Sequence, residues 1–376
     1  MRQMNWKAAL ADYIKNPAFE SYGAFKEERP VKVDCSLGVN PLEGLYPGAT
    51  MTLHTKSKDT KLDLSIYSLY PRGGAMGHKT LPDQVAARWP KVKANEILFG
   101  AGSQCALSSM GRVLGGSKVK IQGYLPCYVP GVMEFLAAGA QFDPVINPAP
   151  DFKIDVDALI AGLKDDTTIF YLDNPNNPTG NSVTMAEIEK LAKACLEKGI
   201  LFLSDEAYAD FIDDSVSALN LDLPNIICAR SFSKGCGFAG LRVGYVVVKD
   251  TELCKISNDM GIIFSCSGLA ADVAAAMLPD LDLAGARKGV KELKAKTVKF
   301  MLSYPGFTIA PTHESTPIVF LTWDKPGSLY DALMNVGIMS EPGRFFAQPD
   351  SSVRLRVPSP SNFELFCSLW EKAFKK

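Results

Sequence analysis

Short apolar runs rich in β-branched residues alternate with longer amphipathic stretches through the first two thirds of the chain. Residues 184–198 show the amphipathic pattern, because their apolar positions recur at helical spacing on one face. Thr184, followed three positions later by Glu187, predicts a capping box at the start of that helix. This alternation predicts an α/β fold with a mostly parallel sheet and helices on both faces. The expected strands are residues 97–99, 119–122, 141–146, 168–172, 200–204, 225–230 and 243–248.

The pattern changes after about residue 255, where longer helical stretches are followed by short elements. We therefore expect an N-terminal arm over residues 1–45, a large domain over 46–255 and a smaller α+β domain over 256–376. Residues 44–79 are rich in loop-forming residues, and they form either a plain surface loop or a segment that covers an active site. The elements expected in the smaller domain are residues 268–277, 283–303, 317–323, 328–336, 353–357 and a last helix from Asn362.

Composition narrows the class of protein. The chain has 376 residues and a formal net charge of −1, so it lacks the basic footprint of a nucleic-acid-binding protein. Its nine cysteines form no C-x-x-C pair and its three histidines show no metal-ligand spacing, so we expect reduced thiols and no metal site. No apolar run approaches the roughly 20 residues that span a bilayer, and the first residues show no signal-peptide pattern. We expect no membrane partner and a cytoplasmic location.

The segment 231–244 carries the strongest chemical signal. It places Lys234 in a turn of small residues, with Arg242 eight positions later. A lysine that forms a Schiff base with a cofactor aldehyde needs a neutral amine and a pocket of low dielectric. Ser231 and Arg242 offer a hydroxyl and a guanidinium, which together suit a phosphate dianion. This arrangement is typical of pyridoxal 5'-phosphate (PLP) chemistry.

Three further stretches of the sequence support that interpretation, and each lies at the end of an expected strand or within one. Asp205 follows the strand 200–204 and is either a helix N-cap or the partner of a protonated pyridine nitrogen. Small residues at 100–104 join a strand to a helix, where backbone N–H groups favour a phosphate. Arg354 alternates with apolar residues in a strand near the C-terminus and should have an anionic partner. Arg356 points to the same face and forms either a second anion contact or a structural salt bridge.

Together with the turn at 173–180, whose sequence is DNPNNPTG, these motifs resemble the class I and II aminotransferases, which are fold-type I PLP enzymes. The resemblance covers most of the chain and implies a role for individual residues. Lys234, Asp205 and Tyr208 are implied to be catalytic. The implied cofactor contacts are Gly102, Ser103, Gln104, Ser231 and Arg242 at the phosphate, Tyr128 stacked on the ring, Asn177 and Tyr208 at the 3'-oxygen, and Tyr70 or its neighbour Tyr67 reaching the phosphate of the other subunit. The implied substrate contacts are Arg354 at the α-carboxylate, with Gly38, Asn40 and Asn177 nearby.

The resemblance also implies an activity. It predicts a homodimer that transfers an amino group from an L-amino acid to a 2-oxo acid, with Lys234 as the base. It further implies that the N-terminal arm packs with the small domain. The sequence is nearest in character to the histidinol-phosphate aminotransferase-like branch, and a decarboxylase resembling the phosphothreonine decarboxylases or a carbon–heteroatom lyase is the alternative. Glu341 stands near the place where that branch carries a phosphate-binding arginine, although Arg344 is close, so we expect a cationic or neutral substrate side chain.

Overall fold

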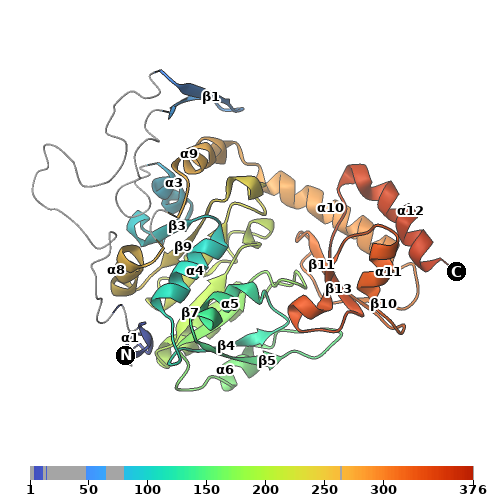
Figure 1. Cartoon of the computed structure of the whole chain (residues 1–376), viewed down its shortest axis with the longest axis horizontal. Helices are drawn as coiled ribbons and strands as arrows, with labels where there is room; N and C mark the ends of the chain where they lie inside the picture. The colour runs from blue at the N-terminus through green and yellow to red at the C-terminus, as the bar shows by residue number, and fades with distance from the viewer. Residues whose placement is uncertain (1–3, 12–13, 15–47, 65–79, 263–264, 376) are drawn as a thin grey trace, which may run out of the picture.

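The computed structural model describes residues 4–11, 14, 48–64, 80–262 and 265–375. Its centre is a seven-stranded sheet with the strand order β3-β9-β8-β7-β6-β4-β5, shown in Figure 1. Strand β9 is antiparallel to both of its neighbours, and the other strands are parallel to one another. The strands are β3 (Ile97–Gly100), β4 (Lys120–Leu125), β5 (Gln141–Ile146), β6 (Ile169–Asp173), β7 (Leu201–Asp205), β8 (Ile226–Ser231) and β9 (Gly244–Val248).

The middle of this sheet is apolar on both faces. Every residue of β6, β7, β8 and β9 is buried, as expected for strands covered by helices on both sides. Helix α4 packs on α5, and α6 packs on α7. Thr184 caps α7 and forms the predicted capping box with Glu187. The helices of this layer are α3 (Leu81–Arg88), α4 (Ser103–Val113), α5 (Pro130–Ala137), α6 (Val156–Ala161), α7 (Met185–Glu197), α8 (Thr251–Met260) and α9 (Gly268–Met277).

A second, antiparallel sheet of four strands follows in the order β10-β11-β13-β12. In Figure 1 the long helix α10 runs from the large sheet layer towards this small sheet, with α11 and α12 beside it. A separate apolar core that includes Met301, Leu333 and Trp370 lies between these helices and the strands. The elements are α10 (Leu283–Met301), β10 (Phe307–Ile309), β11 (Ile318–Trp323), α11 (Leu329–Asn335), β12 (Glu341–Pro342), β13 (Ser352–Arg356) and α12 (Phe363–Phe374).

One segment differs from the sequence-based expectation. The antiparallel hairpin of β1 (Thr50–His54) and β2 (Asp59–Asp63) lies within the region expected to be loop. Its residues are exposed or half-buried except Leu62, so the segment lacks the apolar run that signals a buried strand. None of the described helices has the length and apolar character needed to cross a membrane.

The described part of the N-terminal arm lies on the large sheet layer. Helix α1 (Trp6–Ala9) buries Trp6 completely in the core of that layer. The Asn5 side chain donates to the Thr167 carbonyl at 2.6 Å, and the Trp6 ring donates to Asp250 at 3.3 Å. The resemblance implied packing of the arm with the small domain. Of that arm the structure describes residues 4–11 and 14, and Trp6 and Ala9 pack in the core of the large layer. The predicted contacts Gly38, Asn40, Tyr67 and Tyr70 lie outside the described residues.

Candidate active site

The predicted polar residues gather at the carboxyl edge of the parallel strands. Asp173 ends β6 and Asp205 ends β7, and the two are Cα partners in the parallel ladder. Lys234 follows the end of the next strand, β8. Because ligands of open α/β sheets bind outside the carboxyl ends of the strands, this edge is the expected position of the site.

Lys234 lies against an aromatic ring. Its Nζ atom is 5.4 Å from the centre of the Tyr208 ring, and Tyr208 itself is buried. Partial desolvation lowers the pKa of Lys234, the positive charges of Arg354 and Arg242 lower it further, and Glu341 opposes the shift. This environment favours the neutral amine that attacks an aldehyde or accepts a proton.

Asp205 is a buried carboxylate without a cationic partner among the described residues. It accepts hydrogen bonds from the Tyr171 hydroxyl at 3.1 Å and the Ala207 backbone N–H at 3.2 Å. Burial raises its pKa to about 7, and the negative charge of Asp173 contributes to the rise. The protonated ring nitrogen of PLP would supply the missing cation, so this carboxylate fits the cofactor.

The other end of the site suits a phosphate. Gly102 has φ 84° and precedes the first turn of α4. Arg242 donates to the Ala101 carbonyl at 3.0 Å and to the Ser233 hydroxyl at 3.3 Å, which places its guanidinium at the start of that helix. A Cβ atom on Gly102 would lie 2.5 Å from Arg242 Nη2, so only glycine permits this approach. A helix N-terminus beside a guanidinium fits a phosphate dianion.

Tyr128 and Gln104 contact each other on the side of helix α5. The Tyr128 hydroxyl donates to Gln104 Oε1 at 3.3 Å, and the Gln104 amide donates to the Pro130 carbonyl at 2.9 Å. The Tyr171 hydroxyl lies 3.3 Å from the Tyr128 carbonyl, and the same hydroxyl donates to Asp205. Tyr128 is therefore connected to the Asp205 end of the site through one side chain.

Arg354 joins the small sheet to the turn after β6. It donates to Asn177 Oδ1 at 2.8 Å and forms an ion pair with Glu341, its Cα partner across the β12–β13 ladder. Its guanidinium also lies 5.6 Å from the centre of the Phe346 ring. The neighbouring Arg356 is exposed. Of the two strand arginines, the one predicted to bind the substrate is thus the one that reaches the large sheet layer.

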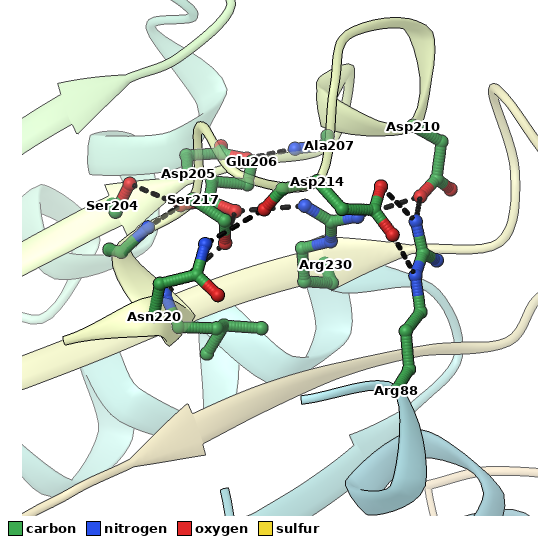
Figure 2. A network of polar contacts seen from close by, with 12 residues as sticks. Arg88, Ser204, Asp205, Glu206, Ala207, Asp210, Asp214, Ser217, Asn220 and Arg230 are labelled. Carbon is green, nitrogen blue, oxygen red and sulfur yellow. Dashed lines mark hydrogen bonds and ion pairs between the residues drawn. The ribbon is translucent and has the colours of Figure 1, made fainter. Parts of the chain in front are cut away.

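A buried ionic network holds the backbone around the site, as Figure 2 shows. Arg230 bonds Glu206 at 2.8 Å and Asp210 at 2.7 Å, and Arg88 bonds Asp210 at 2.9 Å. Asp210 also accepts from the Cys236 thiol at 3.3 Å, two residues beyond Lys234. The turn that carries Lys234 is therefore hydrogen-bonded to this network through Cys236.

Asp173, Tyr171 and Arg230 were not among the predicted site residues. Asp173 ends a buried strand as Asp205 does, so its position at a strand end was an available signal. Tyr171 and Arg230 lie inside completely buried strands, where polar groups need partners, and this was the signal for them. Which partners they bind could not be read from the sequence.

Comparison with known proteins identifies the family of the chain. The model of the family "Aminotransferase class I and II" matches residues 45–368. Histidinol-phosphate aminotransferase 2 of Haemophilus influenzae is 28% identical over 78% of this chain and 79% of that protein. Histidinol-phosphate aminotransferase 1 of Mannheimia succiniciproducens is 32% identical over 74% of this chain and 76% of that protein.

Solved structures show the same fold. The histidinol-phosphate aminotransferase of Clostridium acetobutylicum has a TM-score of 0.71 at 18% identity, over 81% of this chain and 90% of that one. The Sinorhizobium meliloti enzyme, solved in complex with PLP, has a TM-score of 0.69 at 22% identity, over 78% of this chain and 80% of that one. The architecture is therefore that of the fold-type I PLP-dependent enzymes.

The chain belongs to the class I and II aminotransferase family. It is a PLP-dependent aminotransferase, and it resembles the histidinol-phosphate aminotransferase branch. The relatives and structural neighbours named above are all aminotransferases, so the comparisons do not favour the decarboxylase or lyase alternative.

Proposed function

We propose that this aminotransferase moves an amino group from an L-amino acid to a 2-oxo acid at the site around Lys234. The observation that carries the proposal is the position of Lys234, a lysine of lowered pKa at the sheet edge that also carries Asp205. When bound, PLP supplies the aldehyde that captures the amino group and the ring that accepts electrons. The protein supplies orientation, charge and a base.

Each residue of the site is proposed to perform one part of this reaction. The neutral amine of Lys234 would take the proton from the substrate Cα and deliver it to the former aldehyde carbon of the cofactor. Arg354 holds the substrate α-carboxylate, and its bond to Asn177 fixes the direction of the guanidinium. Asp205 would pair with the protonated ring nitrogen. Tyr208, which stacks on Phe211 and whose ring centre lies 5.4 Å from the Lys234 amine, would contact the 3'-oxygen.

The remaining contacts are proposed on the same basis. Tyr128 would stack on the ring, and Asn177 would donate to the 3'-oxygen. We propose that Gly38 and Asn40 lie over the substrate and that Tyr70 of a neighbouring subunit completes the phosphate site, which requires a homodimer. The phosphate contacts are Gly102, Ser103, Gln104, Ser231 and Arg242.

The division at residues 45 and 255 and the cytoplasmic location also stay proposals. The separate apolar core of the small sheet supports a second domain, but α9 packs in the core of the large sheet layer, which argues for a boundary later than residue 255. The described cysteines form no disulfide with one another, which supports a reducing compartment.

We further propose that the donor side chain is cationic or neutral. Glu341 forms an ion pair with Arg354, so a carboxylate stands beside the group that receives the substrate. A phosphorylated side chain placed near Glu341 would meet like charge, and Arg344 is engaged by Asp350. The named relatives act, by their names, on histidinol phosphate, and this acidic residue argues for a different side chain here.

Single-turnover mixing of the PLP-loaded enzyme with a panel of amino acids, without a 2-oxo acid, tests both proposals. Conversion of the cofactor to pyridoxamine phosphate with one equivalent of 2-oxo acid names the donor. The Lys234→Ala variant should lose this conversion by at least about 10³-fold, and Lys193→Ala, an exposed control, should keep it. Product that accumulates over many turnovers as CO₂ or ammonia would contradict a transaminase reaction. A Glu341→Arg variant with the same donor ranking would contradict the substrate proposal.

A further inference from the structure

Asp173 accepts four hydrogen bonds at the centre of the site. Its Oδ1 atom accepts from the Tyr124 hydroxyl at 2.6 Å and the Asn176 amide at 3.0 Å. Its Oδ2 atom accepts from the backbone N–H of Tyr128 and of Asn177, both at 2.9 Å. The residue is 2% exposed. Burial raises the pKa of Asp173, and the four hydrogen bonds oppose that rise. Three of the four partners can only donate, which favours the ionised carboxylate.

Two of the four donors belong to proposed cofactor contacts. Tyr128 lies in the loop after β4, and Asn177 lies in the turn after β6. One oxygen atom of Asp173 therefore fixes the backbone of both residues. An asparagine at this position could not accept all four hydrogen bonds. Its amide nitrogen only donates, and in either orientation of the amide that nitrogen would face a pair of donors.

The charge of Asp173 acts on Asp205. The two residues are Cα partners on neighbouring strands, and both are buried. Neither forms an ion pair with a lysine, arginine or histidine of the described chain; their partners are hydroxyl and N–H donors. A cation bound at Asp205 would thus lie in the field of two carboxylates in a region of low dielectric.

We propose that Asp173 is a positioning residue of the transamination site: it fixes Tyr128 and Asn177 and provides a second negative charge that favours the protonated ring nitrogen of bound PLP. The inference rests on the proposed role of Asp205. It deepens the proposed function, because it gives a reason for the ring nitrogen to stay protonated when only one carboxylate contacts it.

The test compares PLP with 1-deazapyridoxal 5'-phosphate, which has carbon in place of the ring nitrogen. Apoenzyme variants are titrated with both compounds, and the ratio of dissociation constants measures the preference for the nitrogen. Asp173→Asn should reduce this preference about tenfold and weaken PLP binding about 10- to 100-fold. Tyr124→Phe removes one donor but keeps the charge, so it should leave the preference unchanged within about twofold.

Three outcomes decide the proposal. An unchanged preference in Asp173→Asn, with Asp205→Asn abolishing it, overturns the role of Asp173 and leaves that of Asp205 intact. If the preference for PLP over the 1-deaza compound is unchanged in both Asp173→Asn and Asp205→Asn, the role of Asp205 in the proposed function is overturned as well. Equal loss in Tyr124→Phe and Asp173→Asn shows that packing, and not charge, is the cause. If Asp173→Asn fails to fold, Asp173→Ser, a smaller neutral residue, takes its place with the same expected loss.

Discussion

Glu341 and Arg354 face each other across the β12–β13 ladder and form an ion pair. The second donor group of Arg354 binds Asn177 on the large sheet layer. The guanidinium is thus held by one acid of its own sheet and one amide of the other layer. If Arg354 has its proposed role, the substrate α-carboxylate has Glu341 as its neighbour.

Replacing Arg354 should affect substrate binding selectively. In Arg354→Gln the KM for amino donors should rise about 10- to 100-fold, because a hydrogen bond between charged groups contributes about 1.5–3 kcal/mol. Arg356→Gln, on the same strand but exposed, is the matched control and should change KM less than about threefold. Steady-state kinetics of both variants measure the difference. Equal KM changes in the two variants would contradict the assignment of Arg354.

Asp205 should make the apoenzyme less stable as pH rises. Its pKa is about 7 in the folded protein and 3.8 as the ordinary value, so the folded state binds more protons between these values. The free energy of unfolding should therefore fall from pH 5 to pH 8, by up to about 3 kcal/mol from this residue. Urea titrations of the apoenzyme and of Asp205→Asn measure the slope, and the variant should lack this part of it. Saturating PLP should offset the fall. If Asp205→Asn kept the wild-type slope of unfolding free energy against pH, the fall could not be assigned to Asp205 as a buried carboxylate without a cationic partner.

Any side chain at position 235, next to Lys234, should destabilise the protein. A Cβ atom there would lie 2.2 Å from the Cβ of Asp210, within the buried network. Gly235→Ala should cost about 1–3 kcal/mol of unfolding free energy and weaken PLP binding, because overpacking displaces the lysine turn. Gly240→Ala is the control, since a Cβ atom there meets no atom within 4 Å. Thermal unfolding and PLP titration of the two variants make the comparison, and equal behaviour would refute the steric argument.

Lys294 should give the opposite pH dependence. This lysine is 3% exposed and donates only to hydroxyl and carbonyl oxygens, including Thr316 Oγ1 at 2.9 Å and the His313 carbonyl at 2.7 Å. Desolvation lowers its pKa from 10.5 to about 7, so the folded state binds fewer protons between these values. The free energy of unfolding should rise from pH 7 to pH 9.5, by up to about 3 kcal/mol from Lys294.

Lys294→Met is the variant that tests this dependence. Chemical denaturation at pH 7 and pH 9.5 should show a smaller rise in the variant than in the wild type. Lys291→Met, an exposed residue one helical turn away that pairs with Glu314, is the control and should retain the wild-type rise. A rise in Lys294→Met as large as that of the wild type would show that the lysine keeps its charge in the folded protein.

Periodicity and turn chemistry predicted most elements of the large sheet layer. The strand predicted at 141–146 is β5 (Gln141–Ile146), and the helix predicted at 184–198 is α7 (Met185–Glu197). These elements were predictable because burial repeats every two residues in a half-buried strand and every 3.6 residues in a helix. The hairpin β1–β2 was not predicted, because few of its side chains are buried and its pattern is weak.

Strand ends and small-residue turns are local features, so the sequence was enough to predict the α/β architecture and the class of cofactor and to indicate Lys234 as the candidate lysine. Only the tertiary structure decided which groups are partners. The four donors of Asp173 come from the end of β4, the loop after it and the turn after β6. The pairing of Glu341 with Arg354 follows from the register of two strands. Such contacts depend on packing between elements that are distant in the sequence, and a local pattern does not specify that packing.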